Sequence, residues 1–121
     1  MTTTMPIAEN MPPELASALR QVRERFVTGL APLILEIEAL HEQIAEGRSP
    51  DAAATRMAFV AHRIRGLAGT VGIGTLGSRA SAVEDQARAI LRHGICTDPE
   101  GFEATVEALL DEMEDAVVDF S

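Results

Sequence analysis

His62 is the residue whose type and surroundings best fit a chemical role. If the apolar residues around it face a core, the helical advance of about 100° per residue places His62 on the opposite, outer face. A neutral imidazole exposed there is a competent nucleophile near neutral pH. Arg65, about one turn further on, offers a fork of hydrogen-bond donors suited to phosphoryl oxygens. Together the two residues indicate a nucleophile with an anion-binding partner.

The rest of this outer face is predicted to be small, because Ala58, Gly66 and Gly69 are the other residues expected beside His62. Glycine inside a helix costs about 1 kcal/mol relative to alanine, so two of them next to one histidine need a reason. The lack of bulk indicates that something approaches the imidazole closely. A lone histidine is more commonly a surface or packing residue, and the small face and Arg65 are what favour the chemical interpretation.

Other patterns carry less chemical meaning. His41 and His93 are expected to be exposed or packing residues, and with Cys96 they form no recognisable metal motif, so no metal is predicted. The segment Gly72–Gly77 matches G-x-G-x-x-G, but dinucleotide binding requires a preceding strand, whereas a helical pattern precedes it here. An interhelical turn is predicted instead. The sequence contains no P-loop and no kinase-type nucleotide motif, so we do not expect it to use ATP by itself.

An amphipathic first segment is predicted from Pro13 to Gly47, since apolar residues recur in it at spacings of three, four and seven. Gly29 and Pro32 interrupt the pattern without changing its register, so we expect a kink or a short break there. The segment is therefore predicted to form one bent helix or two. Its apolar stripe is Leu15, Leu19, Val22, Phe26, Leu33, Ile37, Leu40 and Ile44.

Three further helices are predicted after it. Ser49–Asp51 and Asp98–Glu100 each combine an N-cap residue, a proline at the first helical position and an acid in the first turn. Glycines at 72 and 74 predict a turn between the two middle helices. The three stripes are Ala53, Met57, Val60, Ile64, Leu67 and Val71; Leu76, Ala80, Val83, Ala87 and Ile90; and Phe102, Val106, Leu109, Met113, Val117 and Phe120.

Four helices with short connections predict an all-α fold, an antiparallel four-helix bundle with an additional or kinked N-terminal helix. A chain of 121 residues suits a single domain, which we place at residues 13–121 after a flexible leader at residues 1–12. Aromatic residues make up only 3% of the chain, with no Trp or Tyr, so aliphatic residues must build the core. That composition favours helices over strands.

The net charge of −9 is unevenly distributed. Residues 1–47 carry a net charge of −4, residues 48–92 carry +4, and residues 93–121 carry nine acids and no base. The basic middle segment could attract an anionic group. Nucleic acid is not an expected partner, because the acidic remainder would repel phosphates and no aromatic residues are interleaved with the arginines.

The sequence also argues against membrane and secreted classes. No apolar run approaches the roughly 20 residues needed to span a bilayer, so no membrane association is expected. Residues 1–10 lack the basic and apolar regions of a signal peptide. A single cysteine, Cys96, fits a reducing compartment. A cytoplasmic protein is therefore predicted.

The segment Ala61–Gly72 resembles the signature of histidine-containing phosphotransfer (HPt) domains, His-x-hydrophobic-Lys-Gly-x-Ala-x-x-x-Gly. Its Ala-Gly-Thr-x-Gly ending is most similar to the phosphotransfer domain of chemotaxis histidine kinases. In the next helix, Leu76 and the pair Val83 and Glu84 stand at the family's offsets. The resemblance covers about residues 25–92, and the final helix agrees only in character.

The resemblance implies a role for each matching residue. His62 corresponds to the phosphorylated histidine, and Arg65 to a basic residue, usually Lys, that helps to hold the phosphoryl group. Gly66 corresponds to the glycine that leaves room for a partner. Glu84 corresponds to an acid that hydrogen-bonds the histidine and sets its tautomer. Arg65 stands where the family usually has Lys, so an inactive HPt domain is conceivable. The chain contains no lysine at all, however, so Arg in place of Lys fits its overall composition.

The implied function is that of a phosphocarrier rather than a turnover enzyme. The expected partners are response-regulator receiver domains and a sensor or chemotaxis-type histidine kinase, with Mg²⁺ held by the receiver and no cofactor on this chain. The surface around His62, with Arg63, Ala58, Gly66 and Gly69, is the expected contact. The alternative is a non-catalytic helical adaptor or pseudo-HPt that docks on a receiver or kinase without phosphotransfer.

Overall fold

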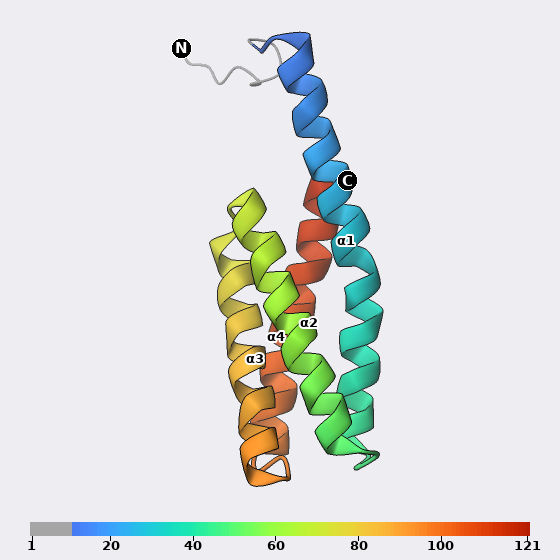
Figure 1. The fold of residues 1–121 in the computed structure, drawn as a ribbon, viewed down its shortest axis with the longest axis vertical. Coiled ribbons are helices and arrows are strands. Elements are labelled where there is room, and N and C mark those ends of the chain that lie inside the picture. The colour runs from blue at the N-terminus through green and yellow to red at the C-terminus, as the bar shows by residue number, and fades with distance from the viewer. Residues whose placement is uncertain (1–10) are drawn as a thin grey trace.

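Four helices make up nearly all of residues 11–121, the part of the chain that the structure, a computed structural model, describes. They are α1 (Pro13–Ala45), α2 (Pro50–Val71), α3 (Gly74–His93) and α4 (Pro99–Phe120). Each runs antiparallel to the one before it, and contacts join α1 to α2, α2 to α3, α3 to α4 and α4 back to α1 (Figure 1). The predicted antiparallel four-helix bundle is confirmed. Most of the predicted leader, residues 1–10, lies outside the described residues.

Local sequence explains where the helices begin and end. Proline occupies the first turn of α1, α2 and α4, where its fixed φ suits a helix and its missing N–H costs nothing. The Asp98 carboxylate accepts a hydrogen bond from the Gly101 N–H, as predicted for an N-cap. Ser49 occupies the corresponding position of α2 but makes no side-chain cap, because its backbone is left-handed (φ 43°). Gly72 and Gly94 end α2 and α3 with positive φ, which glycine adopts without strain.

The first helix continues through the proline that was expected to disturb it. Pro32 lies inside α1, which is a single helix of 33 residues that curves along its length (Figure 1). Of the two forms predicted, one bent helix or two helices, the structure has the first. Leu30 and Leu33, on either side of Pro32, are buried, and their packing holds the helix together where the proline removes a backbone hydrogen bond.

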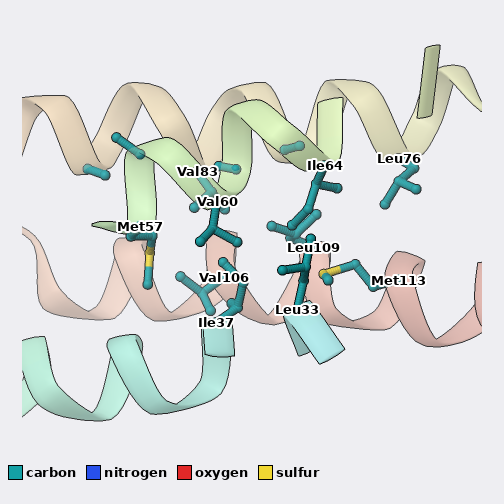
Figure 2. Close-up of a cluster of buried hydrophobic side chains, with 14 of the residues drawn as sticks. Leu33, Ile37, Met57, Val60, Ile64, Leu76, Val83, Val106, Leu109 and Met113 are labelled. Atoms are coloured by element: carbon teal, nitrogen blue, oxygen red, sulfur yellow. The ribbon is translucent and has the colours of Figure 1, made fainter. Parts of the chain in front are cut away.

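The core lies along the axis of the bundle and is built mainly from aliphatic side chains of all four helices (Figure 2). Its central layers are labelled in Figure 2: Leu33 and Ile37 from α1, Met57, Val60 and Ile64 from α2, Leu76 and Val83 from α3, and Val106, Leu109 and Met113 from α4. These residues belong to the stripes that the periodicity identified. None of the helices in residues 11–121 combines the length and apolar character needed to cross a membrane.

A second buried face of α2 packs against α3, and the periodicity alone did not reveal it. Its members are small: Ala54, Ala58, Ala61 and Ala68 are all buried. A Cβ built on Gly77 of α3 would lie 3.8 Å from the Cβ of Ala68, so the two backbones approach closely. The α2–α3 pair is the most extensive in the bundle, so side chains at the junction of these two helices are positioned by closely packed backbones.

The N-terminal end of α1 extends past the adjoining ends of the other helices (Figure 1). Leu15, Leu19 and Val22 were expected in the same apolar stripe as Phe26, but they are between 38% and 49% exposed. The expectation is wrong for these three residues because this end of α1 projects past the other described helices, and Val22 only borders a hollow with Leu67, Thr70 and Val71 of α2. Burial on α1 begins at Phe26, whose ring packs on Phe120 near the end of α4, with 4.8 Å between the ring centroids.

Candidate functional site

His62 projects from the middle of α2 into solvent, and its side chain is 62% exposed. The neighbouring Ala61 and Ile64 are fully buried, so the core packing of α2 determines the direction of the imidazole. The predicted exposure of His62 is therefore confirmed. An exposed imidazole on a rigid helix can meet a second macromolecule without any rearrangement of the bundle.

Glu84 of α3 lies directly behind this imidazole. Its side chain is only 7% exposed, and it is the one buried charged residue among residues 11–121. The Nδ1 atom of His62 lies 3.3 Å from Oε2 of Glu84. Because Nδ1 is the nitrogen that faces the carboxylate, Nε2 is the nitrogen left to face a partner. A carboxylate at Nδ1 favours the tautomer that carries its proton there and leaves a lone pair on Nε2.

Two arginines complete the cluster around Glu84. Arg88, one turn further along α3, donates to Oε2 from Nη2 at 2.6 Å and from Nε at 3.2 Å. Arg65 of α2 brings Nη1 to 3.6 Å from Oε1. The hydrogen bonds from Arg88, and then the positive charges nearby, hold the pKa of Glu84 below its ordinary value, against the opposing effect of burial. The carboxylate is therefore ionised at neutral pH and attracts all three groups.

The two glycines expected beside His62 are exposed, and a Cβ built on Gly66 or Gly69 would meet nothing within 4 Å. The fold of this chain therefore does not require glycine at either position. Ala58 differs from the expectation, since it is only 4% exposed. Its predicted place on the outer face is wrong, because the face it occupies is covered by α3.

Arg63 is exposed but lies on the side of α2 that faces α1, away from the cluster around Glu84. It borders a shallow depression formed with residues of α1, namely Gln21, Glu24, Arg25, Thr28 and Gly29. The structure thus brings His62, Arg65 and Glu84 together and leaves Arg63 apart from them.

Three residues beside His62 were not singled out from the sequence. The sequence does not identify Arg88, because its role depends on Glu84 being buried next to the imidazole. Phe59 and Leu91 are exposed apolar side chains that line a hollow of about 340 Å³ together with Thr55, Ala58, His62 and Arg88. The signal available was position, since Phe59 precedes His62 by one helical turn and Arg88 follows Glu84 by one turn.

The other residues and motifs considered in the sequence lie outside the cluster around Glu84. His41 is half-buried, with its ring 5.6 Å from that of Phe102, and His93 is exposed at the end of α3. Gly72–Gly77 forms the connection from α2 to α3 and the first turn of α3, as expected for an interhelical turn. Within residues 11–121, no three His, Cys, Asp or Glu side chains are grouped so as to hold a metal ion.

Comparison with known families adds one finding. A family model described as Hpt domain matches residues 21–117 of the chain. Comparison with curated proteins and with solved structures gives no match. The matched span contains the imidazole, the buried carboxylate and both arginines of the cluster.

Proposed function

The chain belongs to the Hpt domain family, whose members act in phosphotransfer within phosphorelays, and we propose that His62 is the residue that carries the phosphoryl group. The observation that carries the proposal is the 3.3 Å approach of Nδ1 of an exposed imidazole to the buried carboxylate of Glu84. It supports an Nδ1–H tautomer, in which Nε2 is the nucleophile. A histidine with only a surface or packing role would need no such partner.

The proposed step is an in-line attack by Nε2 on the phosphorus of an aspartyl phosphate in a receiver domain. A bond from Nε2 to phosphorus forms as the bond from phosphorus to the carboxylate oxygen breaks, and the aspartate departs as a carboxylate. The proton on Nδ1 stays in place, so the phosphorylated ring is cationic. Glu84 stabilises that positive charge from behind, and the reverse step passes the phosphoryl group to another receiver.

Arg65 is the residue we assign to the phosphoryl oxygens. Its guanidinium is half-exposed and lies on the same side of α2 as His62, within 3.6 Å of Glu84. A guanidinium offers paired donors that suit the oxygens of a transferring phosphoryl group. Gly66 and Gly69 then provide the open surface that a partner needs to approach.

The partner we infer is a receiver domain, because its acidic phosphorylation pocket complements the basic segment of residues 48–92. Mg²⁺ would be supplied by that pocket rather than by this chain. A chemotaxis-type or other histidine kinase as donor, and a cytoplasmic location, remain predictions from the sequence.

Labelling tests this function directly. Wild-type protein incubated with a panel of phosphorylated receivers is expected to gain an acid-labile, base-stable label, and His62→Gln is expected to gain none. Because the side chain of His62 is largely exposed, the thermal midpoint of the variant should match that of wild type. Arg20→Gln, which alters an exposed cation of α1 outside the basic segment, serves as the control and should retain labelling.

One result would favour the adaptor instead. If wild-type protein binds a receiver or kinase from the panel but takes up no label from any of them, the chain docks without chemistry. A label that survives in His62→Gln would show that another residue is phosphorylated.

A further inference from the structure

Arg88 and His62 approach the same atom. Oε2 of Glu84 accepts the two hydrogen bonds from Arg88, at 2.6 and 3.2 Å, while Nδ1 of His62 lies 3.3 Å from that oxygen. The shorter contacts belong to Arg88. In the unphosphorylated protein, the arginine is therefore the principal partner of an oxygen that the imidazole also needs.

The other oxygen of Glu84 is unsatisfied. Oε1 is buried and accepts no hydrogen bond from residues 11–121, and Nη1 of Arg65 lies 3.6 Å away. A buried carboxylate oxygen without a donor is costly. The cluster thus brings three nitrogen atoms, two of Arg88 and one of His62, to within 3.3 Å of Oε2 and none as close to Oε1, so Oε2 can lose the hydrogen bonds from Arg88 and still keep the imidazole as a partner.

We propose that Arg88 alternates between two anions, binding Glu84 when His62 is free and the phosphoryl group when His62 is phosphorylated. The inference rests on the proposed function of His62. When Arg88 leaves, Oε2 becomes available to the Nδ1–H of the imidazole. Arg88 then has two effects: it weakens the hold of Glu84 on the free imidazole, and it stabilises the phosphorylated one.

The surroundings of Arg88 permit this exchange. Its side chain is 55% exposed, and it lines the same hollow of about 340 Å³ as His62. A phosphoryl group on Nε2 would place a charge of about −2 and three acceptor oxygens beside this hollow. Arginine binds such oxygens in bidentate fashion, and the doubly charged group competes well with a single carboxylate.

A small phosphoryl donor isolates this effect from receiver docking. Phosphoramidate can label an exposed imidazole: the Nε2–P bond forms, the P–N bond of the donor breaks, ammonia leaves, and the proton on Nδ1 stays. The comparison uses full-length wild type, Arg88→Gln and Arg88→Lys, with Arg92→Gln as control. Arg92 is exposed one turn further along α3, and the structure gives it no ion pair among residues 11–121.

Two measurements decide the proposal. The half-life of the label on Arg88→Gln should be about 3- to 10-fold shorter than on wild type or Arg92→Gln, with Arg88→Lys in between. In the unphosphorylated proteins, the ¹⁵N shifts of the His62 ring should move toward the Nδ1–H tautomer in Arg88→Gln alone. A purely structural role for Arg88 would lower the thermal midpoint without moving the ring tautomer in this direction.

Each outcome is decisive. Equal half-lives and unchanged ring shifts in Arg88→Gln would overturn the exchange while leaving His62 as the phosphorylated residue. Failure of wild type to take label from phosphoramidate and from every receiver would refute the proposed function, and the exchange with it.

Discussion

Glu84 is the residue on which the geometry of the site depends. A buried carboxylate is costly unless cations and donors surround it, and here His62, Arg65 and Arg88 do so. The hydrogen bonds from Arg88 contribute most to lowering the pKa of Glu84. The negative charge of Glu84, which attracts the imidazole, therefore also contributes to the stability of the folded protein.

Glu84→Gln should therefore change how stability depends on pH. Because the folded pKa of Glu84 is lowered, its ionised form stabilises the protein above the unfolded pKa of about 4.5, and this contribution is lost as pH falls through the folded pKa. We expect the variant to be less stable than wild type by about 1–3 kcal/mol at pH 7. Denaturant unfolding should show this difference shrinking below about pH 4.5.

Glu36→Gln provides the matched comparison. Glu36 also pairs with an arginine, Arg56, and its pKa is also lowered, but both side chains are partly exposed. An exposed pair contributes about 0–1 kcal/mol, so its removal should have a smaller effect at every pH. If the free energy of unfolding of Glu84→Gln stayed below that of wild type by the same amount from pH 7 to pH 3.5, the proposed link between the pKa of Glu84 and stability would be wrong.

At the scale of the element, α2 serves two purposes at once. One side is buried against the core and against α3, which gives the helix a rigid position, and the other side carries His62 and the open positions Gly66 and Gly69. Glycine lowers helix stability, and at these positions the fold gains nothing from it. We therefore propose space for a partner as the reason for these glycines.

Gly66→Gln tests that reason. The added side chain meets no atom of this protein, so the thermal midpoint should stay the same or rise slightly with the better helix propensity. Transfer from a phosphorylated receiver should fall by about tenfold or more, because the side chain keeps the two reacting atoms apart. Labelling by phosphoramidate, which is far smaller, should persist.

Ala52→Gln is the control for this experiment, since Ala52 is exposed on the first turns of α2, far along the helix from His62. It should retain both kinds of labelling. Receiver transfer that is equally fast in Gly66→Gln and in wild type would refute the close-approach argument.

At the scale of the whole molecule, the bundle is shorter than its first helix. Core packing begins at Phe26 and continues through Leu30, Leu33 and Ile37. The N-terminal end of α1 projects past the other described helices (Figure 1), and the turn before Phe26 meets them only at its edge, where Arg23 donates to the Asp119 carbonyl of α4. The apolar stripe of α1 is therefore continuous in sequence, but we expect only its buried part, from Phe26 onward, to contribute strongly to the free energy of unfolding.

A pair of leucine truncations measures this division. Leu30→Ala removes a fully buried side chain and should lower the free energy of unfolding by about 2–5 kcal/mol. Leu19→Ala removes a side chain that is 44% exposed on the same helix and should cost less than about 1 kcal/mol. Denaturant unfolding of both variants is the measurement, and similar losses would mean that the projecting end packs against something in solution.

Much of the fold and part of the site could be predicted from the sequence by itself. Periodicity, proline positions and glycines identified four helices, their antiparallel order and the exposure of His62. These features are local, since spacings of three and four residues determine which side chains share a face. The motif around His62 also drew attention to Arg65, Gly66 and Glu84, which the structure finds near the imidazole or on its open face.

Only the tertiary structure decided which faces are covered and by what. Ala58 is buried because α3 covers a second side of α2, and Leu19 is exposed because it lies on the end of α1 that projects past the other described helices. Arg88 became relevant only once Glu84 was placed behind His62 on a neighbouring helix. The reason is the same in each case: a helical pattern states which residues point in one direction, but the neighbour found in that direction depends on how separate helices pack.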